Sequence, residues 1–246
     1  MSSASEPAVR YTSAIDPYLG GMMPKILIFI AILVSACASP GPTADPLARV
    51  VGWFAYVAGD DLAAACRPGT PVRYRAVYNA RYTKQVRTYD LAQARPGESA
   101  VMTVRAFKGT VRLLEAERPE GSFVGVTRQQ FLNAADFEAV GAALQREGAF
   151  AWPDRRLFLH SNTYYWVVSA CQNGRFSVAA LKAPPEALNG LEFARVLFRL
   201  DNTGADIVPA VMTEIDRLTR FGQISESPVQ QTFVTFQLIA GPGGIE

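Results

Sequence analysis

The apolar run from Ile26 to Val34 most constrains what this chain can fold into, because it separates residues that are removed from residues that form the domain. One positive charge, Lys25, precedes the run, and two small residues follow it before Cys37. The run has about half of the ~20 residues that a membrane-spanning helix needs. This order of charge, short apolar core and small residues is typical of a secretory signal peptide and not of a folded element.

The residues Val34, Ser35 and Ala36, directly before Cys37, resemble the lipobox of bacterial lipoproteins. The resemblance implies that the Cys37 thioether takes a diacylglycerol, that the chain is cut before it, and that the new amino group is acylated with palmitate or a similar fatty acid. Because Ala38 and not aspartate follows the cysteine, it also implies the periplasmic face of the outer membrane. The alternative is plain secretion, since Ala36-Cys37-Ala38 also fits an A-x-A site for ordinary signal peptidase, which would remove the cysteine.

The signal divides the chain into three parts. The residues before Met22 carry three charges and no apolar periodicity, so we expect translation to begin at Met22 or Met23. We assign residues 1–36 to this mis-assigned start plus the signal peptide, and residues 37–45, which contain two prolines and a glycine, to a flexible tether. Residues 46–246 are then expected to form a single domain in the periplasm.

Cysteine usage supports an exported domain. If Cys37 carries lipid, only Cys66 and Cys171 remain, and an even remainder in an exported chain predicts a disulfide. In the chain-entropy treatment, closing a loop of this length contributes roughly 4 to 5 kcal/mol. The alternative is two free buried thiols. With Cys37 lipidated, two cysteines and one histidine, without a C-x-x-C pair, fall short of a tetrahedral set, so we expect no metal site, and no cofactor.

The charge balance restricts the classes of partner. The chain has 24 basic and 22 acidic residues, and a net charge of +2 does not call for a nucleic acid. Nearly all of the basic residues are arginines, whose rigid guanidinium group suits carboxylates and phosphates. A GC-rich genome explains the same preference without any function.

Residues 71–90, PVRYRAVYNARYTKQVRTYD, are the most distinctive stretch of the expected domain. Alternation places aromatic and apolar residues on one face of a strand and arginines on the other. Basic residues interleaved with aromatic ones can bind anions, although they can also form a merely solvated face. The candidate residues for binding an anion or a partner, here and in the next hairpin, are Arg73, Arg75, Arg81, Arg87, Arg105 and Arg112.

Two glycine-containing pairs predict hairpins. Asn173-Gly174 predicts a turn that sets Cys171 opposite Phe176, Val167 opposite Ala180 and Trp166 opposite Leu181. Both faces of that hairpin are mainly apolar, so we expect it to be central in its sheet. Lys108-Gly109 predicts a hairpin between residues 100–107 and 110–114, with Val104 opposite Leu113 and Arg105 opposite Arg112.

The remaining elements complete an α+β domain with a largely antiparallel sheet and three or four helices. Helical spacing predicts helices over residues 45–65, 133–147 and 206–220, the first broken at Gly59 and resumed with Asp60 and Asp61 as caps, and the last capped by Asp206. Alternation predicts further strands over residues 155–160, 193–200 and 231–240.

The expected domain carries no recognisable catalytic motif. We therefore expect a lipid-anchored envelope lipoprotein that acts in interaction or scaffolding, through a protein partner or an anionic polymer. Whether it is also an enzyme stays open. The alternative is an envelope hydrolase acting on cell-wall or lipid material, with His160 as its base and Ser161 or a distant serine as its nucleophile.

Overall fold

The computed structural model describes residues 53–108, 125–151, 156–220, 236–242 and 244–245. All of them belong to one compact unit, Thr43–Glu246. Strands and helices alternate along the chain without regular crossovers, and every strand pair is antiparallel. The predicted α+β class with a largely antiparallel sheet is therefore confirmed.

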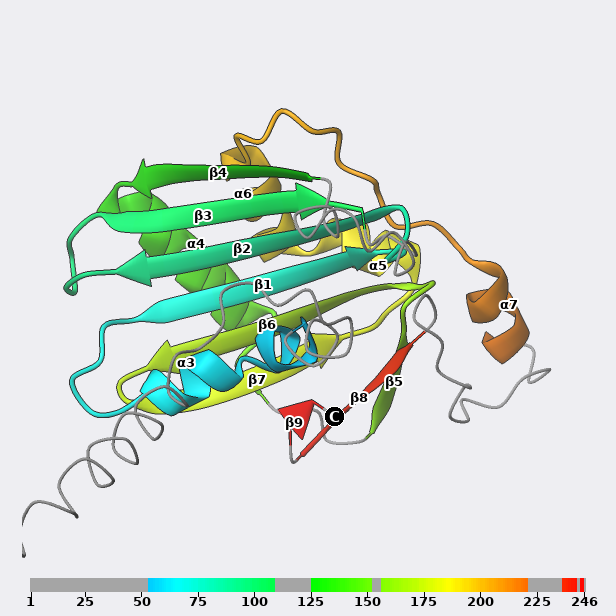
Figure 1. The fold of residues 1–246 in the computed structure, drawn as a ribbon, viewed down its shortest axis with the longest axis horizontal. Helices are drawn as coiled ribbons and strands as arrows, with labels where there is room; N and C mark the ends of the chain where they lie inside the picture. The colour runs from blue at the N-terminus through cyan, green and yellow to red at the C-terminus, as the bar shows by residue number, and fades with distance from the viewer. Residues whose placement is uncertain (1–52, 109–124, 152–155, 221–235, 243, 246) are drawn as a thin grey trace, which may run out of the picture. The chain divides into compact units, whose positions relative to one another are not determined.

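A six-stranded sheet with the order β4-β3-β2-β1-β6-β7 forms the centre of the unit (Figure 1). Its strands are β1 Arg73–Ala80, β2 Gln85–Gln93, β3 Ala100–Phe107, β4 Gly125–Leu132, β6 Tyr164–Gln172 and β7 Arg175–Leu181. A smaller sheet contains β5 Leu157–His160, β8 Gln237–Gly241 and β9 Gly244–Ile245.

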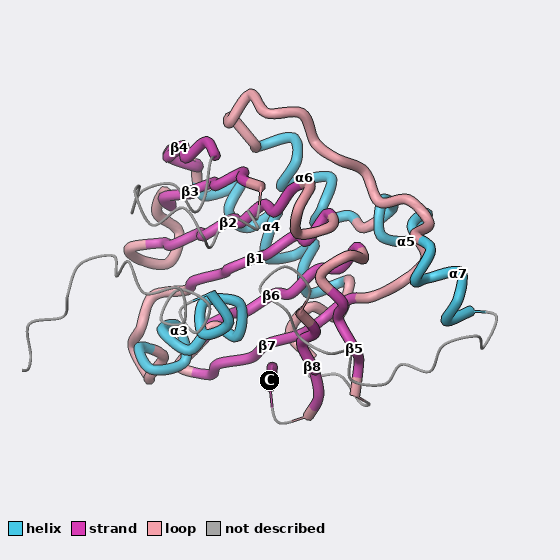
Figure 2. The backbone as a smooth tube through the Cα atoms, turned by 45° about the vertical axis from the view of Figure 1, so that its right-hand side comes forward, coloured by secondary structure: helices cyan, strands magenta, loops and turns pink. Residues whose placement is uncertain are grey.

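Helices cover both faces of the large sheet (Figure 2). On one face, which we call the core face, lie α4 Ala134–Arg146, α5 Pro185–Gly190 and α6 Glu192–Leu200. On the other, which we call the outer face, lie a helix over residues 53–58 and α3 Asp60–Ala65. The last helix, α7 Glu214–Arg220, follows a long loop after α6.

The core face buries the larger apolar cluster. Trp166 of β6 stacks on Tyr78 of β1 with ring centroids 4.7 Å apart and meets the edge of Phe193 from α6 at 5.1 Å. Helix α4 packs close to the sheet at Gly141, where an added Cβ would lie 2.6 Å from the Tyr74 hydroxyl. The predicted helix over residues 133–147 is confirmed, and the Asn133 side chain caps it.

The outer face buries a second cluster beneath the first helices and the small sheet. The two helical segments are broken at Gly59, as predicted, where the backbone has φ +79°. A Cβ at Gly59 would lie 2.6 Å from the Ser169 hydroxyl oxygen, so only glycine lets this bend rest on β6. Asp60 and Asp61 do not cap α3, because its N-cap is Gly59 without a side-chain bond. Residues 45–52 of that predicted helix lie outside the described residues.

A disulfide links the end of α3 to the end of β6. Cys66 and Cys171 are bonded, with their Cα atoms 5.6 Å apart, as the cysteine count predicts. The register of the β6–β7 hairpin is also confirmed, with the three predicted pairs directly opposite each other. The predicted central position is confirmed for β6 and is wrong for β7, which is the outer strand and is contacted by β9 of the small sheet.

Residues 193–200 form helix α6, so the strand predicted there is wrong. In this segment the apolar and basic residues fit period 2 and period 4 equally well. Phe193, Ala194 and Leu197 are buried, which is a helical face, while the arginines Arg195 and Arg199 lie one turn apart on the other side. Packing of that face against Trp166 decides between the two patterns.

The hairpin predicted at Lys108-Gly109 is also wrong in its pairing. Both sides of β3 are occupied, by β2 and by β4. Val104 therefore lies opposite Tyr89 and Arg128, and Arg105 lies opposite Thr88 and Thr127. The predicted partners, in residues 110–114, lie outside the described residues.

The helix predicted from Asp206 begins only at Glu214. Its cap is Thr213, whose hydroxyl accepts from the Asp216 amide at 3.1 Å while the Asp216 carboxylate accepts from the Thr213 amide at 3.0 Å. The strand predicted over residues 155–160 is β5, and the last predicted strand is β8, shorter than expected, with residues 231–235 outside the described part.

Candidate functional site

Arg75 is at the centre of a polar cluster on the outer face of the sheet. Its side chain is only 5% exposed and lies over the Tyr56 ring, 3.7 Å from the centroid. The guanidinium donates from Nε to Asp90 at 2.6 Å and from both terminal nitrogens to the Asp61 carboxylate at 2.6 and 2.9 Å. It also donates to the Tyr56 carbonyl at 3.0 Å. Arg75 thus links the first helices to β1 and β2.

Asp90 is shared between two arginines and a tyrosine. Its carboxylate accepts from Arg75, from Arg105 of β3 at 2.8 Å and from the Tyr56 hydroxyl at 2.5 Å. Burial and the neighbouring Asp90 charge raise the pKa of Tyr56, which keeps its phenol protonated as a donor. Burial opposes ionisation of Asp61, but the bonds and charge of Arg75 outweigh it and lower the pKa of that carboxyl. Two arginines therefore balance two carboxylates in this cluster.

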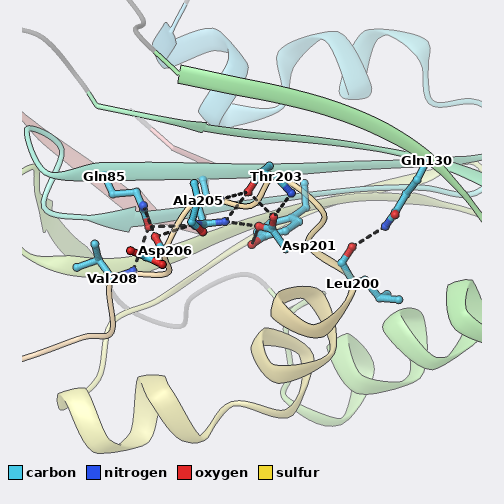
Figure 3. A network of polar contacts seen from close by, with 10 residues as sticks. Gln85, Gln130, Leu200, Asp201, Thr203, Ala205, Asp206 and Val208 are labelled. Carbon is cyan, nitrogen blue, oxygen red and sulfur yellow. Dashed lines mark hydrogen bonds and ion pairs between the residues drawn. The ribbon is translucent and has the colours of Figure 1, made fainter.

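Arg87 enters the core face one strand away and is fully buried. Its guanidinium forms an ion pair with Asp201, and it donates to the carbonyls of Ala205 at 2.5 Å and Asp206 at 2.9 Å. Gln85 accepts from its Nε at 2.9 Å. Figure 3 shows the loop after α6 lying along β2 at these contacts. The buried arginine therefore fixes a loop in place.

Asp201 stays ionised in this buried setting. Burial would raise its pKa, but hydrogen bonds from Thr203, a bond from the Tyr89 hydroxyl at 2.8 Å and the charge of Arg87 lower it below the ordinary value. Because every charge has a partner, the pair satisfies the requirement for buried ions. Neither Arg75 nor Arg87 presents a guanidinium that is open to an external anion.

The other predicted arginines are not brought together. Arg73 begins β1, whereas Arg81 follows its far end, in a left-handed conformation at φ 58°. Among the described residues the Arg81 Nε has no hydrogen-bond partner, although it is buried. Arg105 is half-exposed beside Asp90, and Arg112 lies outside the described residues. Cys37 also lies outside them.

Three arginines lie at the end of the sheet that carries the disulfide, and we call them the arginine end: Arg67, Arg73 and Arg175. Arg73 lies opposite Cys171 in the β1–β6 pair, and Arg175 starts β7 just after the hairpin turn. A Cβ on Gly174 in that turn would lie 2.7 Å from the Arg67 carbonyl carbon, so the loop after α3 touches the turn. Within the described residues no carboxylate forms an ion pair with any of the three.

Sequence reasoning missed Arg67 and Arg175 because it took its candidates from residues 71–90 and the hairpin after them. The disulfide places Arg67 at this end of the sheet, and the β6–β7 hairpin places Arg175 there. The spacing of Arg67 from Cys66 and of Arg175 from Cys171 is the signal that could have found them. When a disulfide is predicted, charged residues close to its two cysteines in the sequence are also expected to lie at the same end of the fold.

His160 and Ser161 are held by structural hydrogen bonds. The His160 Nδ1 accepts from the Asn162 amide at 3.1 Å, and the Ser161 hydroxyl oxygen accepts from the Phe236 amide at 3.1 Å. His160 is 6% exposed, and burial together with the charge of Lys182 lowers the pKa of its imidazole. The two side chains therefore stabilise the turn between β5 and β6.

The β4 strand is the outer strand at the other side of the sheet, and sequence reasoning predicted no element there. Most of its residues are exposed, and the Phe131 side chain is 82% exposed. Only Arg128 carries a charge. We call Gly125–Leu132 the β4 edge.

Two kinds of feature are absent from the described residues. No helix there has the length and apolarity required to cross a membrane. No cluster of three potential metal ligands occurs in this part of the chain. Comparison with protein-family models, with curated proteins and with solved structures found no match to this chain, so function must be argued from its own residues.

Proposed function

We propose that this protein is a lipid-anchored lipoprotein of the cell envelope, on the periplasmic face of the outer membrane, that acts as an interaction or scaffolding component. The observation that carries the proposal is the division of its three cysteines. Cys66 and Cys171 form a disulfide, which leaves Cys37, at the end of the signal-like segment, as the lipid acceptor. Structural disulfides persist in oxidising compartments, which agrees with export.

The arginine end supplies the contact with an anionic partner. Arg67 and Arg175 are exposed and Arg73 is half-buried. Arg67 follows a cysteine of the disulfide, whereas Arg73 and Arg175 lie on the strands next to the other cysteine. Guanidinium groups that have no ion pair with a described carboxylate favour carboxylates or phosphates of another molecule. This moves the proposed contact away from Arg75 and Arg87, which already have internal partners.

The hydrolase alternative has no support among the described residues. A triad needs a serine hydroxyl whose proton the histidine can accept. The His160 Nδ1 instead accepts from the Asn162 amide, which leaves the proton of the neutral ring on Nε2. In this tautomer neither ring nitrogen is free to accept the proton of a serine hydroxyl.

The anchor is tested by replacing Cys37 with Ser in the full chain and growing cells with radiolabelled palmitate. Wild-type protein should incorporate label and remain in the membrane fraction, whereas Cys37→Ser should do neither. A Cys66→Ser variant is the matched control, since its cysteine is equally removed but its label should be unchanged. Equal labelling of wild type and Cys37→Ser would contradict the anchor.

The arginine end is tested by co-sedimentation of the full-length protein with purified cell-wall sacculi. For the Arg67→Gln, Arg73→Gln, Arg175→Gln triple variant, the amount of protein that sediments with the sacculi should fall at least tenfold. Added salt should release the wild-type protein from the sacculi. The control carries the same loss of charge elsewhere, as Lys84→Gln, Arg195→Gln and Arg199→Gln. Equal sedimentation of both variants would remove the arginine end from the proposal.

A further inference from the structure

The β4 edge lacks the features that normally keep a sheet edge from pairing with another chain. Such edges are usually short, charged, interrupted by proline or covered. β4 runs for eight residues, contains neither lysine nor proline, and carries Arg128 as its one charge. In the part of the chain that the structure describes, it pairs only with β3.

The opposite edge of the same sheet differs. The outer strand there, β7, has mostly buried or half-buried residues, and β9 of the small sheet packs against it. Lys182, directly after β7, donates to the Phe158 carbonyl of β5 at 3.0 Å. One edge of the sheet is therefore covered by described elements, and no described strand pairs with the free side of the other.

The β4 edge also has an apolar end. Phe131 is one of two large hydrophobic side chains that are exposed in the described residues. It lies opposite Val101 on β3, and its neighbours on the same face are the uncharged Thr103 and Gln129, which bond to each other at 3.3 Å. A strand with a single charge and one exposed aromatic side chain fits the addition of another strand.

We propose that the β4 edge binds the β4 edge of a second copy of this chain, so that the two large sheets join into one continuous antiparallel sheet. A twofold axis perpendicular to the sheet relates the copies, which makes each contact occur twice. This inference does not depend on the anchor or on the arginine end.

Side-chain alternation and charge select the register. In an antiparallel pair, opposite residues point to the same face, so odd positions of β4 must lie opposite odd positions. With the axis at residue 128, Arg128 would lie opposite itself, and like charges directly opposite each other are unfavourable. With the axis at Gln129, the pairing extends from Val126 to Leu132 and no charges are opposed.

This register is self-complementary. Gln129 lies opposite Gln129, where two amide side chains can bond to each other. Arg128 lies opposite Gln130, and Phe131 lies opposite Thr127, so that each exposed ring covers the methyl group of a threonine in the other copy. A partner strand of another protein would need none of this symmetry, and self-complementarity is what favours a second copy.

The register predicts which cysteine cross-links. In membranes containing full-length Gln129→Cys, an oxidant should convert the protein into a disulfide-linked dimer, because opposite Cα atoms lie about 5 Å apart, within disulfide range. The matched control is Thr103→Cys, whose residue lies beside Gln129 on β3. Across the proposed interface two residues 103 are about 14 Å apart, so this variant should stay monomeric.

Two further variants test the symmetry. Thr127→Cys and Phe131→Cys should not cross-link alone, since each is displaced by about 14 Å from its own copy along the strands. Co-expressed, they should form a mixed dimer. The native Cys66–Cys171 disulfide, seen by peptide mapping, reports that each variant has folded.

Charged substitutions at Gln129 test the same interface without any cross-link. Full-length protein in detergent should sediment as a dimer, and Gln129→Lys should sediment as a monomer because two lysines meet at the axis. Mixing Gln129→Lys with Gln129→Glu should restore the dimer. The proposal is overturned if Thr103→Cys cross-links and Gln129→Cys does not, which would mean stacking of sheet faces. It is equally overturned if wild type is monomeric, or if Gln129→Cys cross-links only to a different protein.

Discussion

The large sheet has two unlike halves, one linked and covered and one exposed. In the linked half, β1, β6 and β7 carry helices on both faces, the small sheet on the outer face and the Cys66–Cys171 disulfide at one end. In the exposed half, β3 and β4 have α4 and the end of α6 on the core face, while the outer face of β4 carries exposed side chains. Figure 1 shows both halves in one view.

The two halves differ in the number of their charged residues and in what those residues contact. In and beside the linked half, arginines are paired with carboxylates inside the fold, as in Arg75 with Asp61 and Arg87 with Asp201. The exposed half has few charges and no disulfide. Changes in the first half should therefore alter the free energy of unfolding, and changes in the second should alter association.

Loss of the disulfide should have the largest effect. Replacing both Cys66 and Cys171 with Ala should lower the free energy of unfolding by about 4 kcal/mol, because the bond restricts a long loop in the unfolded chain. Urea unfolding of the wild type and the double variant measures it. A loss below 1 kcal/mol would show that the linked half does not depend on its disulfide.

Breaking the buried ion pair should be nearly as costly. Asp201→Ala leaves the Arg87 charge buried without its carboxylate, which should lower the free energy of unfolding by about 3 kcal/mol. Asp206→Ala is the matched control, since Asp206 meets Arg87 through its backbone carbonyl. Equal stability of the two variants in urea would mean that the pair contributes little.

The outer-face cluster should contribute less. Asp61→Ala removes a carboxylate that is more than half exposed, and solvent screening reduces such a pair to about 1 kcal/mol or less. Asp60→Ala, one residue away and exposed, should leave stability unchanged. If both variants were equally stable, Asp90 alone would suffice to hold Arg75.

His160 should give a small dependence on pH. The pKa of its imidazole is lower in the folded state, so folding favours the neutral form. Its contribution is complete above the unfolded pKa of about 6.5 and declines as the pH falls below it. Unfolding measured between pH 5 and pH 7 should show a shallower slope for His160→Gln. An unchanged slope would assign the dependence to other groups.

The smallest effect on folding should come from the exposed half. Phe131→Ser removes a ring that the isolated chain does not bury, so the free energy of unfolding at low protein concentration should change by about 0.5 kcal/mol or less. The same variant should weaken association. A large loss of stability would show that Phe131 packs within its own chain.

Local patterns predicted the parts of the fold that local chemistry decides. The Asn173-Gly174 turn fixed the register of β6 with β7, and the cysteine count indicated the disulfide. The segment of residues 193–200 failed because its pattern suits a strand and a helix alike, and only packing on Trp166 separates them. The alternating arginines of β1 and β2 led to the prediction of an anion-binding face, but Arg75 and Arg87 pair with carboxylates inside the fold.

The partners of those arginines could not be predicted from the sequence. Asp90 is 15 positions from Arg75, and Asp201 is 114 positions from Arg87. Alternation places Arg75 on the outer face and Arg87 on the core face, but it does not indicate which carboxylates reach them. The β4 edge was missed for a related reason, since its polar residues give no apolar alternation.

Hydrogen–deuterium exchange of the full-length protein at several concentrations tests the contrast between the two halves most directly. Amides of residues 73–80 should exchange only through global unfolding and at the same rate at every concentration. Amides of residues 125–132 should exchange fast in dilute protein and become protected as the concentration rises. Protection of residues 125–132 as strong as that of residues 73–80 in the most dilute sample would contradict the account, because the edge would then be covered within one chain.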